Sequence, residues 1–418
     1  MSYTSFSIET IDTTVQESEV TVTLRVTNTG EKYSGREVVQ LYVSSPEGRL
    51  DKPYQELVAY AKTKKLKPGQ SEDVAVSFSI DQMASYDEET AAWIWEKGSY
   101  IIRAGEHSRA TKIAAVIRLK KESICRKLEN VLPLDCEMAC IRATRSLYYS
   151  YPEEESELEE AQVISIEEFQ IEEGENGLQK SQTEPEKQMP ETDILYVMDD
   201  AISGKCSFRD IIKQLTVEEM TALCVGTARG GEEESSTIGA ASMTCPGAAG
   251  ETTSALLESR NIRNIILADG PAGLRLSPSF VVDGSRNILY QEPALGGGFM
   301  DILRDIEKKP LPEDAVTHYQ YCTGIPTATL LAQTWDEEAV REAGDIIGSE
   351  MEEFGITLWL APGMNIQRNP LCGRNFEYYS EDPVVSGICA AAETLGVQSH
   401  PGRGTTIKHF ACNNLEDN

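Results

Sequence analysis

The hydrophobic periodicity of this chain changes once along its length, and that change constrains the fold more than any other feature. Up to about residue 118, apolar and polar residues alternate in short runs separated by turn signals. The clearest run has apolar residues at every second position: Val20, Val22, Leu24 and Val26. A period of two places these side chains on one face of a strand. The first part of the chain is therefore predicted to be an antiparallel β-sandwich.

Beyond about residue 204, short apolar runs alternate with amphipathic stretches. The apolar runs predict strands at 264–268, 328–332, 358–361 and 405–409. Thr334, with Glu337 three residues later, is a capping-box signature for a helix between the second and third runs. Apolar strands separated by amphipathic helices are typical of a parallel sheet covered by helices. The sequence thus predicts two domains: a sandwich of immunoglobulin or fibronectin type III kind at 1–118, and an α/β domain at 204–418.

The segment between these domains, 119–203, is predicted to be an acidic linker. Between Glu153 and Glu186 there are thirteen Glu and one Lys, which supply over a third of the formal charge of −30. Such a composition has too few apolar residues to form a core of its own. The charge also argues against a nucleic-acid partner, because phosphate binding requires basic faces.

The chain lacks the sequence signals of membrane-spanning, secreted and phosphate-loop proteins. No run of eighteen apolar residues predicts a membrane span, and the N-terminus has no secretory pattern. The ten cysteines form no C-x-x-C pair, so we expect reduced thiols in a cytoplasmic chain. The insertion at 277–322 contains Gly296, Gly297 and Gly298 but no phosphate-loop Lys, and it is predicted to be a lid or surface loop. Neither a metal nor a cofactor is predicted.

Polar residues follow three of the predicted strands, and they define a candidate site. Asp269 ends the first strand, Arg374 and Glu377 follow the third, and Lys408 with His409 closes the fourth. The carboxyl ends of parallel strands meet at one edge, where ligands collect. A carboxylate, a guanidinium, an ammonium and an imidazole offer both donors and acceptors, which suits a polyhydroxylated ligand. Because any α/β protein places polar residues there, the pattern alone leaves the ligand open.

Four linked motifs carry a resemblance to a known family. They run from Leu267 to Arg275 (LADGPAGLR), from Leu360 to Ile366 (LAPGMNI), from Arg368 through Pro383 (RNPLCGRNFEYYSEDP), and over Lys408-His409-Phe410. In this order they resemble glycoside hydrolase family 3. The stretch 37–43, with Glu56-Leu57 and Lys67-Pro68-Gly69, resembles the fibronectin-like domain of the same family.

The resemblance implies a fold, an activity and roles for four residues. Asp269, Arg374, Lys408 and His409 would bind the hydroxyls of a sugar, while Arg275 would anchor the Asp-Gly-Pro loop. The α/β domain would be part of a (β/α)8 barrel of TIM type. Similar enzymes hydrolyse β-glucosides with retention, using two carboxyl groups. The K-H-F segment lacks the further His of the N-acetylglucosaminidase branch, so the β-glucosidase branch is favoured. The resemblance also implies a non-proline cis peptide near Lys408.

The chain departs from the family pattern at the catalytic centre. The family nucleophile lies in an S/T-D-W motif, and these 418 residues contain no Asp-Trp pair. We assign neither Asp269 nor Glu377 as its substitute, so no catalytic residue is predicted. The sandwich precedes the barrel, as in permuted members of the family. We therefore expect a fragment with an incomplete barrel that supplies the glycone-binding part of an enzyme, with a second chain as a candidate partner. The alternative is a non-catalytic carbohydrate-binding or structural fragment.

Overall fold

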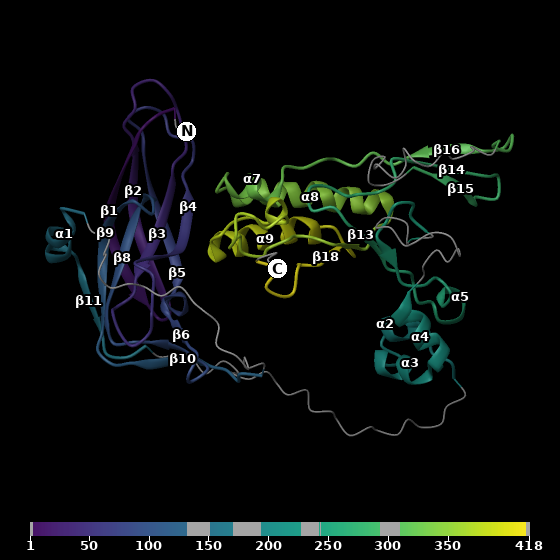
Figure 1. The fold of residues 1–418 in the computed structure, drawn as a ribbon, viewed down its shortest axis with the longest axis horizontal. Helices are drawn as coiled ribbons and strands as arrows, with labels where there is room; N and C mark the ends of the chain where they lie inside the picture. The colour runs from purple at the N-terminus through teal and green to yellow at the C-terminus, as the bar shows by residue number, and fades with distance from the viewer. Residues whose placement is uncertain are drawn as a thin grey trace. The chain divides into compact units, whose positions relative to one another are not determined.

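The computed structural model of the chain divides into two compact units, Met1–Thr183 and Glu184–Asn418 (Figure 1). It describes residues 3–131, 151–169, 194–226, 242, 244–292 and 310–414. Within these ranges no helix has the length and apolar character to cross a membrane. We describe each unit by itself.

The first unit is the predicted antiparallel sandwich. One sheet has the order β1-β2-β5, with β1 at Phe6–Gln16, β2 at Glu19–Asn28 and β5 at Ser71–Ser79. The facing sheet has the order β11-β9-β8-β3-β4, with β3 at Val38–Ser44, β4 at Glu56–Lys62, β8 at Gly98–His107, β9 at Ala110–Leu119 and β11 at Val163–Ile166. A small third sheet, β10-β7-β6, joins Ser123–Lys127, Ala92–Trp95 and Ser85–Asp87, and the 3₁₀ turn η1 spans Ile80–Met83.

The core of the sandwich comes from the alternating residues of the sequence. The four apolar residues of β2 named above are fully buried, as predicted, and they share a core cluster with Leu41 and Ile102 of the facing sheet. Burial of each such side chain contributes about 1.5–3 kcal/mol, which holds the two sheets together. Trp95 is also fully buried, and its indole N–H donates to the Ile80 carbonyl.

Part of the predicted linker belongs to this sandwich instead. Helix α1 (Glu154–Glu160) packs on the unit, and β11 pairs in parallel with β9. The buried guanidinium of Arg103 donates to the Glu154 carboxylate at 2.6 Å, and Phe169 lies against Trp95 in the core. The linker prediction was wrong for 119–131, where β10 pairs with β7. It was also wrong for 151–169, because glutamates that cannot form a core can still dock on a core that offers a buried cation. Residues 132–150 and 170–193 lie outside the described residues.

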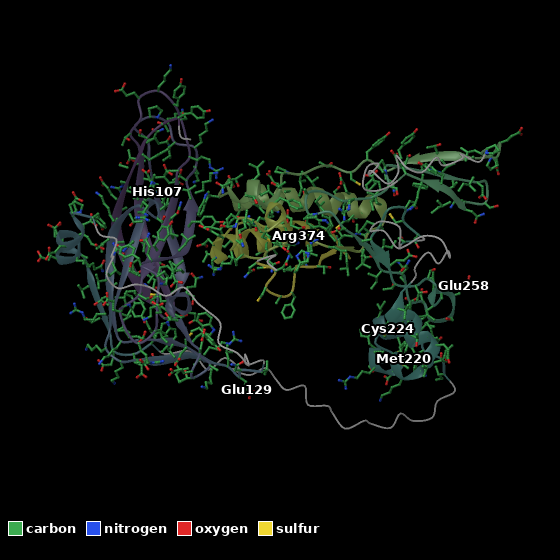
Figure 2. All side chains as sticks on the ribbon, viewed as in Figure 1. His107, Glu129, Met220, Cys224, Glu258 and Arg374 are labelled. Atoms are coloured by element: carbon green, nitrogen blue, oxygen red, sulfur yellow. The ribbon has the colours of Figure 1, made fainter. Side chains whose placement is uncertain are left out.

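The second unit contains a short sheet covered by helices. The strand order is β12-β13-β17-β18, and the last three strands are parallel. Their bounds are Gly250–Glu251, Ile266–Ala268, Leu358–Trp359 and Gly404–Thr405. Helices α8 and α9 pack against each other and, with the short α7, accompany this sheet; they span Glu337–Phe354, Pro383–Gln398 and Ala328–Ala332. A small helical group precedes the sheet, formed by α2 (Met198–Ile202), α3 (Phe208–Gln214) and α4 (Val217–Val225), with α5 at Leu257–Arg260; Met220, Cys224 and Glu258 mark it in Figure 2.

The two long helices pack closely because glycines line their contact. A Cβ added to Gly344 of α8 would lie 2.1 Å from the Glu393 carbonyl oxygen, so no larger residue fits there. Helix α9 begins at Pro383, because the Asp382 carboxylate accepts the backbone N–H groups of Val384 and Val385 and proline suits the first helical position.

Two local predictions fail between residues 328 and 337. The run 328–332 is helix α7 rather than a strand; it consists of the helix formers Ala and Leu with one Thr, and its Leu331 N–H donates to the Thr327 carbonyl. Helix α8 starts at Glu337 with Asp336, not Thr334, as its N-cap; the Thr334 hydroxyl donates to the Leu331 carbonyl and accepts the N–H of Asp336.

The insertion at 277–322 is not only a loop. It carries an antiparallel sheet of order β15-β14-β16, formed by Ile288–Gln291, Ser279–Val282 and Val316–Tyr319. The glycine triplet within it lies outside the described residues. The described part of the second unit therefore has three parallel strands in place of the four predicted.

Candidate sugar-binding site

The candidate site begins at the loop after β13, where the chain turns tightly. Gly270 has a φ of +113°, and a Cβ there would lie 2.1 Å from the Gly273 carbonyl oxygen. The Arg275 backbone N–H donates to the Asp269 carbonyl at 2.9 Å, and the Trp359 indole donates to the Gly270 carbonyl at 3.0 Å. These contacts hold the Asp269 side chain at the carboxyl edge of the sheet.

The loops after β17 and β18 bring the other side chains to the same edge. Gly363 forms isolated parallel bridges with both Tyr378 and Lys408, which ties the two loops together. The 3₁₀ turn η2 (Asn375–Glu377) follows Arg374. The Lys408–His409 peptide is cis, as the sequence resemblance implies.

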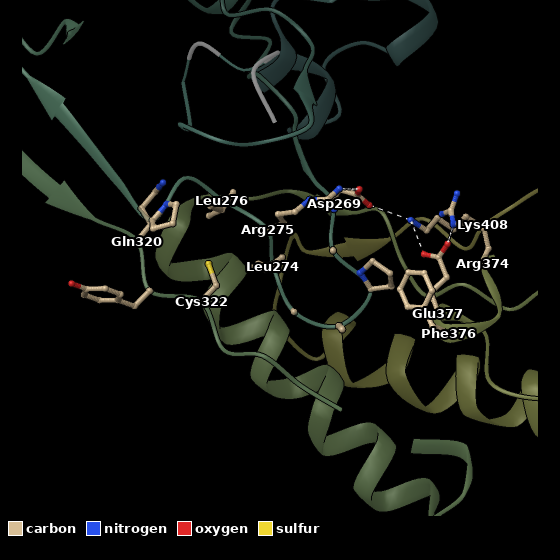
Figure 3. A pocket seen from close by; sticks show the side chains of 16 residues that line it. Asp269, Leu274, Arg275, Leu276, Gln320, Cys322, Arg374, Phe376, Glu377 and Lys408 are labelled. Carbon is tan, nitrogen blue, oxygen red and sulfur yellow. Dashed lines mark hydrogen bonds and ion pairs between the residues drawn. The ribbon is translucent and has the colours of Figure 1, made fainter. Parts of the chain in front are cut away.

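Lys408 links the carboxylates of two loops (Figure 3). Its Nζ lies 3.1 Å from Asp269 Oδ1 and 3.7 Å from Glu377 Oε2. Each carboxylate has a second cation, since Arg275 pairs with Asp269 and Arg374 pairs with Glu377. Donors and acceptors thus alternate along one edge of the sheet.

His409 joins this network through its ring and its backbone. Arg374 Nη2 lies 3.0 Å from its Nε2, and Tyr378 Oη lies 2.9 Å from its Nδ1. The Asn365 amide bonds both backbone groups of the residue, accepting the His409 N–H at 2.7 Å and donating to its carbonyl at 3.1 Å. All four residues predicted from the sequence therefore lie together: Asp269, Arg374, Lys408 and His409.

A cavity of about 670 Å³ opens beside these side chains. Figure 3 shows Asp269, Glu377, Lys408 and Arg374 at one end and Gln320 and Cys322 toward the other. Between them the wall is largely apolar, with contributions from Pro271, Leu274, Leu276, Pro278 and Phe376. A cavity of this size with a few convergent polar groups is typical of a small-molecule site.

The charges at the polar end shift two pKa values. Burial alone would raise the pKa of Asp269, but Lys408, the Gly270 amide and Arg275 outweigh it and hold the pKa below its ordinary value. The pKa of His409 is lowered by burial and by the positive charges of Arg374 and Lys408. At neutral pH the site therefore holds an ionised Asp269 and a neutral His409. Within the described ranges no group of three or more His, Cys, Asp or Glu residues forms a metal-binding cluster.

Comparison with known proteins identifies the two domains of the chain. Residues 313–417 match the glycosyl hydrolase family 3 N terminal domain, and residues 37–108 match the fibronectin type III-like domain. The chain is 32% identical over 410 residues to β-glucosidase A of Butyrivibrio fibrisolvens, with 96% of this chain and 42% of the relative covered. The chain thus carries a glycosyl hydrolase family 3 N terminal domain and a fibronectin type III-like domain. The match to this relative runs through both domains of the chain.

Two further relatives agree with that assignment. A β-glucosidase of Ruminococcus albus is 28% identical over 430 residues, covering 100% of this chain and 38% of the relative. A crystal structure of a β-glucosidase from Paenibacillus barengoltzii matches 99% of this chain and 40% of its own, with 27% identity and a TM-score of 0.69. The chain thus spans about two fifths of the length of these relatives.

Sequence reasoning missed part of the network. Glu377 is only 3% exposed and pairs with two cations of the site, whereas the sequence pattern placed it after the third predicted strand without a binding role. Its spacing of three from Arg374 was a usable signal, because such residues share one face of a helical turn. Tyr378 had no such signal, whereas Asn365 is one of the polar residues that follow the third predicted strand. Arg275 anchors the loop through Asp269, as predicted.

Proposed function

We propose that this chain supplies the glycone-binding part of a β-glucosidase-like enzyme, which hydrolyses β-glucosides with retention of configuration. The observation that carries the proposal is the alternation of paired cations and carboxylates around Lys408 at the mouth of the cavity. Each sugar hydroxyl both donates and accepts, so a fixed row of both kinds of partner suits a glycone. The three relatives reported above are named β-glucosidases, which supports the same substrate class.

In this proposal the two carboxylates of the site bind rather than react. A retaining mechanism requires one carboxyl group to attack and another, about 5 Å away, to donate a proton. Asp269 and Glu377 are instead each neutralised by two cations, which favours roles as hydrogen-bond acceptors. Because these 418 residues contain no Asp-Trp pair, we propose that the nucleophile comes from a segment outside them.

The proposal extends to the architecture. We propose that β13, β17 and β18, with helices α8 and α9, form the first part of a (β/α)8 barrel. Within the described residues β18 pairs on one side only, with β17. A further segment or a second chain would pair with its free edge and complete the cavity.

Calorimetric titration of the chain with glucose tests the proposal. Asp269→Asn should weaken binding about 10-fold or more, because hydrogen bonds to charged groups contribute about 1.5–3 kcal/mol. The control is Glu258→Gln, an exposed acid on α5 that should leave affinity unchanged. We expect no turnover of aryl β-glucosides by the chain alone.

The outcomes separate the two candidate functions. Glucose binding that is lost in Asp269→Asn, without turnover, supports a glycone-binding part of an enzyme. Restoration of turnover by a segment carrying an S/T-D-W motif would then show the enzyme role, and failure to restore it would favour a non-catalytic sugar-binding protein. Glucose binding that survives Asp269→Asn unchanged would refute the assigned site.

A further inference from the structure

The imidazole of His409 has a partner on each nitrogen, and the two partners differ in what they can do. Arg374 Nη2 lies 3.0 Å from Nε2, and Tyr378 Oη lies 2.9 Å from Nδ1. A guanidinium carries donors only and cannot accept a hydrogen bond, whereas a phenol can do both. Nε2 must therefore present a lone pair to Arg374.

Only one protonation state of the ring satisfies both contacts. An imidazolium would direct an N–H at the donor of Arg374, and so would the neutral tautomer protonated on Nε2. The neutral tautomer protonated on Nδ1 accepts from Arg374 and donates to Tyr378 Oη. The lowered pKa of His409, caused by burial and by the two neighbouring cations, agrees with a neutral ring.

Tyr378 is itself held in place by contacts outside the imidazole. Its side chain is fully buried, and its ring meets that of His409 edge-on at 76°, with 6.0 Å between the centroids. Asn413 Nδ2 donates to Tyr378 Oη at 2.6 Å. Asn365 holds the backbone of His409 from the other side. The phenol oxygen is thus fixed before any ligand arrives.

We propose that Tyr378 and Asn413 are positioning residues that hold His409 as its neutral Nδ1–H tautomer, so that Nε2 accepts a hydrogen bond from a sugar hydroxyl. The inference rests on the proposed function. The hydroxyl takes the place of the direct Arg374–His409 contact: it donates its proton to Nε2 and accepts an N–H from Nη2. Fluorine can only accept and hydrogen can do neither, so this position selects a hydroxyl against both.

Nitrogen NMR of the histidine rings tests the tautomer without any sugar. The chain has four histidines, so long-range proton–nitrogen spectra of ¹⁵N-histidine-labelled protein are readily assigned with His409→Gln. At pH 7 we expect a protonated Nδ1 and an unprotonated Nε2 for His409. Tyr378→Phe leaves Arg374 facing Nε2 but removes the acceptor of the Nδ1–H group, so the Nδ1 signals should shift to those of a ring without that hydrogen bond; Tyr379→Phe, the same change at a tyrosine bonded to Glu393, should leave them unchanged. A ring protonated on Nε2, or a pattern unchanged in Tyr378→Phe, would overturn the proposal.

A binding series tests the consequence for the sugar. Glucose is compared with its 3-, 4- and 6-deoxy and deoxyfluoro derivatives by calorimetric titration. At one position the fluoro sugar should bind about 10-fold more weakly than glucose and no better than the deoxy sugar, because the lone pair of Nε2 loses its donor. In Tyr378→Phe that difference should shrink. Equal binding of glucose and all three fluoro sugars would refute the acceptor role. If glucose itself does not bind, the proposed function fails, and the NMR measurement still decides the tautomer.

Discussion

Lys408 joins two carboxylates, so its removal should destabilise the second unit even without a ligand. Replacement by Met keeps the apolar stem and removes the charge. The side chain of Lys408 is 15% exposed, and those of Asp269 and Glu377 are 17% and 3% exposed. Loss of one partner from a buried ion pair costs about 3–5 kcal/mol.

The expected cost here is smaller because neither carboxylate is left alone. Asp269 keeps Arg275, and Glu377 keeps Arg374. We therefore expect Lys408→Met to lower the free energy of unfolding by about 2–3 kcal/mol. For a unit of this size that loss corresponds to about 4–12 °C in Tm.

Scanning calorimetry of the whole chain measures the shift, with Lys205→Met as the matched control. Lys205 pairs with Asp200 in the same unit, but its side chain is 70% exposed, so solvent screens the pair and its loss should lower Tm far less than the loss of Lys408. The double variant Lys408→Met/Asp269→Asn should recover part of the lost stability, because the unpaired carboxylate is gone. Equal Tm shifts for Lys408→Met and Lys205→Met would refute the argument that the pairs are buried and coupled.

Three further predictions concern packing and pH. Burial raises the pKa of Glu393 to about 7, so the free energy of unfolding should fall as the pH rises from about 4.5 through 7. The total loss should be about 3 kcal/mol. Urea unfolding at several pH values measures it, and Glu393→Gln should abolish this pH dependence. Gly344→Ala should destabilise the α8–α9 contact by at least about 1 kcal/mol in the same assay, whereas Gly387→Ala, where a Cβ meets open space, should stabilise the helix by about 0.5–1 kcal/mol. Arg103→Met should release helix α1, because it removes the buried cation that pairs with Glu154. Limited proteolysis within 151–169 should then become faster. Unchanged cleavage would refute the role of Arg103 in holding α1.

The apolar patterning of the chain was predictable wherever one periodicity dominated. In β2 a strict alternation over eight residues made the core face unambiguous, because a slip of one residue would bury its threonines. Helix α8 was recognisable from Ala343, Ile347 and Met351, which all lie buried on one side. The five-residue run 328–332 carried no such period, and its assignment as a strand failed.

In the candidate site, the sequence predicted which residues take part but not how they pair. Asp269, Arg374, Lys408 and His409 stood out in the sequence because each is polar where a strand or its loop ends, and their motif order matched a known family. Only the tertiary structure decided how they pair. Asp269 and Lys408 are 139 positions apart, and no local pattern encodes a contact between them. Their pairing, the burial of Glu377 and the contact of Tyr378 with His409 follow from the strand order, which places three distant loops at one edge of a sheet. The chemistry of each side chain follows from the residue type alone, whereas the partner of a charged group depends on which strands become neighbours in the fold.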